Sequence, residues 1–378
     1  MILKAKTDCE HIKVLFFIPN VMKRGGIESF LMSYFRNMDK SKITFIFCQL
    51  CSTNEKGVLD KEIIENGGLV EYMQFSNKHI FKSKKSIKIL LKKHRPDIIH
   101  VHGDADCVGL LLILKFCKAK NVICHSHNTN SPSNRSKLLI WIKRHLSSTF
   151  CDFRFACSHE AGKWLFGKKQ FSIIPNAICT KDFSFSNTKR IYLRKLYNIK
   201  DNTIVIGCVG HIMIRHKHQD FLVEIAKLAL EKKINIIVCL VGGGTNLNEL
   251  KNRCINEKIF NVIFTGEISN VSGYYSMFDV LALPSFYEGL GITCIEGICS
   301  GLFAIISDKV PMLNGKCDRE LQIPATIDLI DVWLKELCER AKTRFLDGEQ
   351  YIAKIGFSIE KESQRLFEHY QKISSKTS

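Results

Sequence analysis

Apolar runs and amphipathic segments alternate along the first half of the chain. Residues 12–18 form an apolar run broken only by a lysine, which predicts a buried strand. The next segment predicts a helix, because its apolar side chains recur at helical spacing on one face: Ile27, Phe30, Leu31, Tyr34, Phe35 and Met38. Further strands are expected at 43–48, 97–102, 121–125 and 153–157, with helices at 105–118 and 135–148. Strands that alternate with helices are typical of a parallel sheet covered on both faces.

The alternation stops in a polar stretch at 176–188, where we expect an interdomain linker, and then starts again. Strands are predicted at 203–209, 234–240, 261–265, 278–283 and 302–306, the last completing a second sheet, with helices at 219–231, 270–277 and 291–300. The tail from about 325 to 374 is predicted to be helical. We therefore expect two doubly wound α/β domains, 1–187 and 188–355, and a C-terminal helix at 356–378 that packs back on the first domain. Open α/β sheets bind ligands at the carboxyl ends of their strands.

Composition narrows the class of protein. The chain has 378 residues, 46% hydrophobic and 24% charged, which suits two globular domains with their own cores. The longest apolar candidate, 108–117, is short and contains Lys115, so no membrane span is expected. The N-terminus lacks the pattern of an export signal, and we expect a cytoplasmic protein. The 16 cysteines lie mostly in apolar segments and are predicted to be reduced. The single C-x-x-C, Cys48 to Cys51, has no second pair to support a redox or zinc site.

The chain carries 55 Lys and Arg against 37 Asp and Glu, a net charge of +18. Basic surfaces attract nucleic acid, anionic lipid head groups or phosphorylated small molecules. The charge is spread along the chain, and no aromatic–basic nucleic-acid motif is present. Most of the excess is expected to be a solvated surface. The alternative is a peripheral face for an anionic membrane on helix 135–148, which mixes apolar and basic residues: Leu138, Leu139 and Trp141 with Lys137, Lys143 and Arg144.

Two motifs could bind a phosphorylated ligand. Gly25-Gly26 stands between a strand and a helix, where backbone N–H groups can face a phosphate, although an ordinary turn fits as well. It is not G-x-G-x-x-G, so a nicotinamide dinucleotide fingerprint is missing. The second motif, residues 284–296, reads PSFYEGLGITCIE. Glu288 precedes the helix and can reach sugar hydroxyls, Glu296 lies within it and can grip a ribose diol, and the glycine-rich loop faces a phosphate.

The order of these motifs resembles the retaining glycosyltransferases of family 4, which have the GT-B fold of two Rossmann-like domains facing a cleft. Glu288 and Glu296 match the family's E-x7-E motif, Gly25-Gly26 matches its first glycine pair, and Val209-Gly210 opens the second domain. Shared segments at 156–158, 174–177 and 304–308 follow in order. The histidine segment 125–129 is most similar to bacterial capsule and exopolysaccharide members.

The resemblance implies transfer of a sugar from a UDP- or GDP-linked donor to a hydroxyl of a glycan or lipid-linked saccharide in surface polysaccharide synthesis. It implies retention at the anomeric carbon and no metal or other cofactor. Glu288 would contact the donor sugar, Lys217 the diphosphate, and His127 the region beside the reacting centre. The implied donor-binding residues are Gly26, Gly210, His211, Arg215, Gly266, Gly289, Leu290, Gly291, Ile292 and Glu296. The expected acceptor-side residues are His102 and Asp104.

One position departs from the family. The arginine expected after Gly210 is His211 here, and a histidine is neutral over much of the cytosolic pH range. We expect Lys217 to stabilise the leaving group with help from Arg215. A weakened enzyme or a catalytically silent sugar-nucleotide binder is the alternative, and a sugar-nucleotide epimerase or hydrolase of the same fold is another. A nucleic-acid-binding protein would explain the charge but not the pair Glu288 and Glu296.

Other motifs resemble metal sites. Asp104-Ala105-Asp106 is the D-x-D signature of a different glycosyltransferase fold, but aspartate is also favoured where a helix begins. His100-x-His102 and His125-x-His127 each place two rings on one side of a strand, which zinc could use. The interpretation we favour is that one histidine of each pair is buried and the other lines the cleft.

Overall fold

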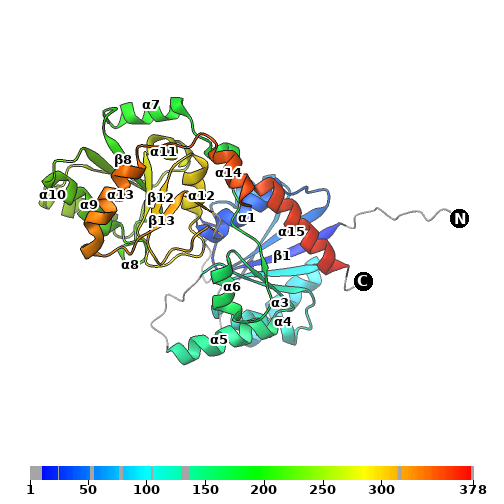
Figure 1. The fold of residues 1–378 in the computed structure, drawn as a ribbon. Helices are drawn as coiled ribbons and strands as arrows, with labels where there is room; N and C mark the ends of the chain where they lie inside the picture. The colour runs from blue at the N-terminus through cyan, green and yellow to red at the C-terminus, as the bar shows by residue number, and fades with distance from the viewer. Residues whose placement is uncertain are drawn as a thin grey trace. The chain divides into compact units, whose positions relative to one another are not determined.

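The computed structural model describes residues 11–23, 25–51, 55–75, 80–103, 105–128, 136–313 and 317–375. The chain divides into two compact units (Figure 1). One is Met1–Ala177 together with Ile359–Ser378, and the other is Ile178–Ser358. The sequence placed the first boundary later, after residue 187, and began the C-terminal helix at 356. No helix of the described residues combines the length and apolar character needed to cross a bilayer.

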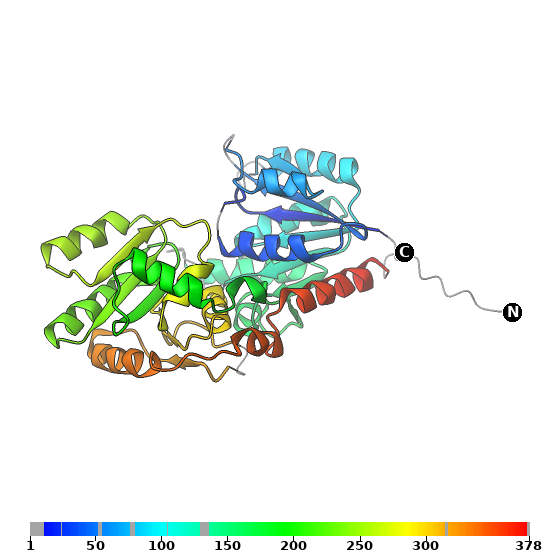
Figure 2. The ribbon, with the colours of Figure 1, turned by 90° about the horizontal axis from the view of Figure 1, so that it is seen from above.

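The first unit contains a parallel sheet of seven strands among its described residues, in the order β3-β2-β1-β4-β5-β6-β7. These are β1 (Ile12–Ile18), β2 (Ile43–Leu50), β3 (Leu69–Met73), β4 (Ile98–His102), β5 (Val122–Ser126), β6 (Phe153–Ala156) and β7 (Ser172–Ile173). Its helices are α1 (Gly26–Asn37), α2 (Asp60–Glu65), α3 (Ile80–His94), α4 (Val108–Phe116), α5 (Lys137–Phe150), α6 (His159–Phe166) and α15 (Ile359–Ser374). The C-terminal helix α15 packs against α1, β1 and β4 (Figure 2).

The central strands of this unit are buried on both faces, which explains why they read as continuous apolar runs. All five residues of β4 and all five of β5 are buried. The two strands pair in parallel with His102 opposite His125. His100 and His102 lie in β4 and His125 lies in β5, so polar rings enter a largely apolar core.

The second unit has six parallel strands in the part of the chain that the structure describes, in the order β10-β9-β8-β11-β12-β13. These are β8 (Ile204–Val209), β9 (Ile236–Val241), β10 (Val262–Gly266), β11 (Val280–Leu283), β12 (Ala304–Ile306) and β13 (Glu320–Gln322). The prediction that 302–306 completes this sheet is wrong, because β13 pairs with β12. The strand β13 has three residues and begins with a glutamate, so the apolar pattern did not show it.

The helices of the second unit are α7 (Asn187–Leu196), α8 (Ile214–Lys217), α9 (Gln219–Glu231), α10 (Leu247–Asn256), α11 (Ser272–Met277), α12 (Ile292–Cys299), α13 (Ile330–Arg340) and α14 (Gly348–Lys354). In each sheet the strand order reverses beside the first strand, between β1 and β4 and between β8 and β11. Such a reversal is where doubly wound sheets bind ligands.

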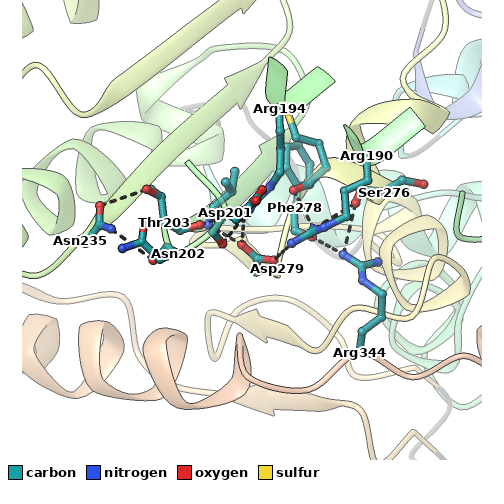
Figure 3. A network of polar contacts seen from close by, with 12 residues as sticks. Arg190, Arg194, Asp201, Asn202, Thr203, Asn235, Ser276, Phe278, Asp279 and Arg344 are labelled. Atoms are coloured by element: carbon teal, nitrogen blue, oxygen red, sulfur yellow. Dashed lines mark hydrogen bonds and ion pairs between the residues drawn. The ribbon is translucent and has the colours of Figure 1, made fainter. Parts of the chain in front are cut away.

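A buried polar network ties α7 to the second sheet (Figure 3). Asp279, just before β11, pairs with Arg190 at 2.5 Å and with Arg194 at 2.7 Å, both from α7. The same carboxylate accepts a hydrogen bond from the backbone N–H of Val205 at 2.7 Å. Arg344 donates to the carbonyl oxygens of Ser300 and Phe278. Because Asp279 pairs with both arginines of α7 and is also hydrogen-bonded to the backbone of β8, the network holds α7 in the second unit.

Candidate functional site

Two loops of the second unit meet at the carboxyl ends of β8 and β11. Lys217 ends α8, and Glu288 lies in the loop after β11. The Lys217 Nζ lies 2.5 Å from the Glu288 Oε1, with the two side chains 20% and 11% exposed. The Ser285 hydroxyl donates to the same carboxylate oxygen at 2.9 Å. The sequence singled out Lys217 and Glu288 separately, and the structure brings them together at the reversal of strand order.

Two histidines that flank Lys217 hold these loops together. The His216 ring stacks on Tyr287 with centroids 4.0 Å apart, and its Nε2 lies 3.0 Å from the Tyr287 carbonyl oxygen. Phe286 donates its backbone N–H to the His216 carbonyl at 2.8 Å and stacks on His218 at 4.2 Å. Burial, and then the charge of Lys217, lower the pKa of His216. Sequence reasoning missed these contacts, because no spacing rule pairs segments this far apart.

Glycines allow the loops that follow β8, β9 and β10 to pack closely against one another. A Cβ on Gly242 would lie 2.1 Å from the Gly210 carbonyl oxygen, and Gly242 has a φ of +142°. The Gly242 N–H donates to the Gly266 carbonyl at 3.1 Å. A Cβ on Gly244 would lie 2.2 Å from the Ile212 carbonyl oxygen. Glycine is therefore needed here for the close approach of one loop to the next.

The helix α12 begins behind the Glu288 loop. Gly291 is its N-cap, in the left-handed conformation with φ +71°. Glycine has no side chain with which to cap the helix, and none accepts a hydrogen bond there. Leu290 is 2% exposed and anchors the loop, while Gly289 and Ile292 frame the helix start. This arrangement aims backbone N–H groups and the positive end of the helix dipole at the loop.

Glu296 lies on α12 beneath this loop and bonds to a buried tyrosine. The Tyr275 hydroxyl, from α11, donates to the Glu296 Oε2 at 2.5 Å. Burial raises the pKa of Glu296 to about 7, and the hydrogen bond from Tyr275 opposes that shift. Nothing in the sequence pattern indicated Tyr275 as its partner.

The two basic positions after Gly210 are both exposed. His211 contributes to the loop through its backbone, since its carbonyl accepts a hydrogen bond from Gln219 Nε2 at 3.0 Å. The Gln219 Oε1 accepts from the Met213 N–H at 3.2 Å, so one buried glutamine shapes this segment. Arg215 lies on α8, two residues before Lys217.

In the first unit, Gly25 is the N-cap of α1. A Cβ on Gly26 would meet nothing within 4 Å, whereas one on Gly25 would lie 2.5 Å from Glu28 Oε2. Steric contacts with neighbouring atoms therefore do not require a glycine at position 26. Asp104 lies outside the described residues. The other carboxylate of the D-x-D motif, Asp106, pairs with Lys143 at 2.5 Å.

Two histidines of β4, one of β5 and His127, which follows β5, form one buried group. His100 and His125 are fully buried, and His102 and His127 are 2% and 7% exposed, so both members of each pair lie inside. This differs from the interpretation that one ring of each pair lines a cleft. The rings stack along each strand with centroids 4.2 Å apart. Burial lowers the pKa of all four and brings that of His127 to about 3.

Three of these histidines have the ligand type and number of a metal site. Nitrogens of His100, His102 and His125 lie within 4.8 Å of one another. Two features oppose occupation by a cation. The rings of His100 and His102 lie face to face, so one ion cannot lie in both ring planes, and His100 Nε2 already faces His125 Nδ1 at 3.1 Å. No carboxylate belongs to this group among the described residues, so a divalent charge would be buried uncompensated.

Comparison with known proteins identifies the class. The family model "Glycosyltransferase Family 4" matches residues 24–182, and "Glycosyl transferases group 1" matches residues 190–315. The chain is 26% identical to the putative glycosyltransferase EpsF of Bacillus subtilis, covering 95% of this chain and 96% of that protein. It is 24% identical to the Escherichia coli UDP-Gal:alpha-D-GlcNAc-diphosphoundecaprenol alpha-1,3-galactosyltransferase, over 65% of this chain and 70% of that one.

The fold is also that of solved structures. Anabaena Alr3699/HepE in complex with UDP-glucose superposes with a TM-score of 0.75 at 16% identity, covering 96% of this chain and all of that one. A glycosyltransferase from Rickettsia africae gives 0.75 at 18% identity, covering 96% and 98%. Two Rossmann-like parallel sheets with this strand order are the GT-B architecture of glycosyltransferases. The chain belongs to glycosyltransferase family 4 and resembles its exopolysaccharide members.

Proposed function

We propose that this glycosyltransferase moves a sugar from a UDP-sugar to a hydroxyl of a lipid-linked saccharide, with retention and without a metal ion. The observation that carries the proposal is the Lys217–Glu288 pair beside the start of α12, where the order of the second sheet reverses. Two comparisons support the donor. The Anabaena neighbour was solved with UDP and with UDP-glucose, and the Escherichia coli relative is named for UDP-Gal.

In the proposed reaction the second unit stabilises the departing nucleotide diphosphate. Lys217 moves its hydrogen bond from Glu288 to a phosphate oxygen, and the N–H groups at the start of α12 donate hydrogen bonds to other phosphate oxygens. Glu288 then binds donor-sugar hydroxyls, and Glu296 binds the ribose diol. Arg215 supplies a second cation in place of the arginine missing at His211. Fixed protein cations here take the part that a metal ion plays in other transferases.

Retention follows if leaving group and acceptor use the same face of the sugar. The bond between the anomeric carbon and the phosphate oxygen breaks, and the acceptor oxygen bonds to that carbon from the same side. The phosphate oxygen that leaves takes the acceptor's proton, so protons balance without another base. We assign His127 beside the donor sugar and Asp104 to the acceptor side. His102, which is 2% exposed, is too deeply buried in this structure for direct acceptor contact.

The acceptor is proposed to be presented at an anionic membrane surface by α5. Leu138 and Trp141 are 66% and 59% exposed on this helix, which also carries Lys137, Lys143 and Arg144. Exposed bulky apolar groups beside basic ones are typical of helices that lie in a bilayer interface. We expect co-sedimentation with anionic liposomes at low salt and its loss in a Leu138→Glu/Trp141→Glu double variant. If the wild-type protein stays in the supernatant, the proposal that α5 binds a membrane is wrong, but the proposed transfer reaction is not affected.

The donor site is tested by thermal stabilisation with UDP, GDP, ADP and their sugars, each with and without EDTA. A ligand at a hundredfold excess over Kd stabilises the native state by about 2.7 kcal/mol. We expect a shift with UDP compounds that EDTA leaves unchanged, and transfer to a lipid-linked acceptor with the donor's anomeric configuration. Loss of the shift with EDTA would contradict metal independence, and an inverted product would contradict retention. Free sugar released without acceptor would indicate a hydrolase instead.

A further inference from the structure

The histidines of β4 and β5 form two separate hydrogen-bonded pairs. His100 Nε2 faces His125 Nδ1 at 3.1 Å, and His102 Nδ1 faces His127 Nε2 at 2.9 Å. The pairs stack on each other, with ring centroids 4.2 Å apart and ring planes tilted by 29° and 22°. A hydrogen bond between two neutral imidazoles needs one protonated and one unprotonated nitrogen, so each pair must choose a direction. That direction decides where the free N–H of each pair lies.

A tyrosine of the C-terminal helix sets the direction of the first pair. The Tyr370 hydroxyl, fully buried on α15, lies 2.8 Å from His100 Nδ1. Burial raises the pKa of Tyr370 well above its ordinary value, so the hydroxyl keeps its proton and can donate it. His100 then carries its own proton on Nε2 and donates to His125. Burial lowers the pKa of His125, and the Ile174 backbone opposes that shift, although His125 Nε2 makes no hydrogen bond among the described residues.

The second pair has no such anchor, and two buried nitrogens of it lack a partner: His102 Nε2 and His127 Nδ1. If His127 donated from Nε2, the unpaired N–H would lie on His102. The His102 ring stacks on Phe16 with centroids 5.8 Å apart, and that side chain has no acceptor atom. Phe30 lies beside both rings, 5.7 Å from His102 and 5.3 Å from His127, so Phe16 is the contact that distinguishes them. If His102 donates from Nδ1, the unpaired N–H lies on His127, which follows the carboxyl end of β5. Buried N–H groups without an acceptor are rare, so the second arrangement points to a ligand.

We propose that His102 is a positioning residue: its Nδ1–H donates to His127 Nε2 and holds the proton of His127 on Nδ1, where it donates to an oxygen of the sugar donor. This inference rests on the proposed function, which assigns His127 to the donor sugar. It replaces the expectation that His102 contacts the acceptor. The ring that reaches the ligand is thereby fixed in one tautomer and one orientation, as partners behind functional histidines do elsewhere.

The test compares variants of the full-length protein in the transfer assay. His102→Phe keeps a stacked ring but removes the donor, and we expect kcat/KM to fall about 10–100-fold, the size seen when hydrogen-bond partners of metal-ligating histidines are removed. His102→Asn returns an N–H donor near the position of Nδ1 and should recover most of the loss. Tyr370→Phe is the matched control, because it removes a hydroxyl from the other pair: we expect a lower Tm and an unchanged kcat/KM.

A second measurement needs no substitution at His102. In protein labelled with ¹⁵N in its histidine rings, His127, assigned by the signals lost in His127→Ala, should show a protonated Nδ1. Protonation on Nε2 would overturn the proposal, as would a His102→Phe protein with wild-type kcat/KM or a His102→Asn protein no better than it. A His127→Ala protein with full activity would instead refute the role of His127 in the proposed function, and the ring spectrum would still report the His102–His127 bond.

Discussion

Replacing Lys217 by alanine is expected to slow sugar transfer by about 10²–10³-fold, equivalent to about 2.7–4 kcal/mol, the effect of removing one positioned group that stabilises developing charge. The same substitution is expected to have a much smaller effect on the free energy of unfolding. Lys217 and Glu288 are 2.5 Å apart, which corresponds to about 6–7 kcal/mol of attraction at an effective dielectric of 20. Most of this is offset by desolvation, because the two side chains are only 20% and 11% exposed.

The Glu288 carboxylate keeps one partner in the Lys217→Ala protein, since the Ser285 hydroxyl still donates to it. We therefore expect a net loss of about 1.5–3 kcal/mol in the free energy of unfolding, the range for a hydrogen bond to a charged group and less than the roughly 3–5 kcal/mol for breaking a fully buried ion pair. At about 2–4 °C per kcal/mol for a unit of this size, the protein stays folded at assay temperature. A large loss of rate with a small loss of Tm is the expected signature.

The assay measures initial rates with saturating acceptor, giving kcat and donor KM, with Tm measured on the same samples. Lys227→Ala is the matched control, because Lys227 pairs with Glu257 at 2.8 Å in the same unit, away from the β8 and β11 loops. We expect the control to retain full activity. Unchanged turnover in Lys217→Ala would refute the assignment of Lys217 to the leaving group. A Lys217→Ala/Glu288→Gln protein no slower than Glu288→Gln would show that the lysine acts only by holding the glutamate.

Three further predictions concern the second unit. The pKa of Glu296 is raised to about 7, so this proposed ribose ligand becomes protonated as pH falls below 7. UDP affinity measured by calorimetry should then weaken by up to about tenfold per pH unit, and Glu296→Gln should remove that dependence. Burial likewise raises the pKa of Glu320 from 4.5 to about 7, so its contribution to stability is complete below pH 4.5 and is lost as pH rises to 7. Glu320→Gln should therefore gain up to about 3 kcal/mol relative to wild type between pH 4.5 and 7.5 in denaturant titrations, and a constant difference would contradict this. Gly242→Ala should lower Tm strongly, because its Cβ would lie 2.1 Å from the Gly210 carbonyl, and a wild-type Tm would show that the loop relaxes freely.

The architecture could be predicted because it depends on local periodicity. Apolar runs alternating with amphipathic helices define both sheets, and strands such as β1 and β8 fall where the runs were found. The short strand β13 was not predicted from the sequence, for a physical reason. Three residues that begin with Glu320 carry no periodic pattern, and they form a strand only because β12 offers an edge to pair with. The helix α7 was also not predicted, because its place in the second unit depends on the ion pairs of Arg190 and Arg194 with Asp279.

The candidate site divides in the same way. The sequence alone determined the chemical groups and their order: Glu288 and Glu296 eight residues apart, the lysine after the first strand of the second domain, and the paired histidines. Only the tertiary structure decided their partners. Lys217 pairs with Glu288, Tyr275 donates a hydrogen bond to Glu296, and the buried His102 is hydrogen-bonded to His127. Residue spacing reports which face of a strand or helix a side chain occupies, whereas hydrogen-bond partners and burial depend on segments that are distant in sequence and meet only when the sheets assemble.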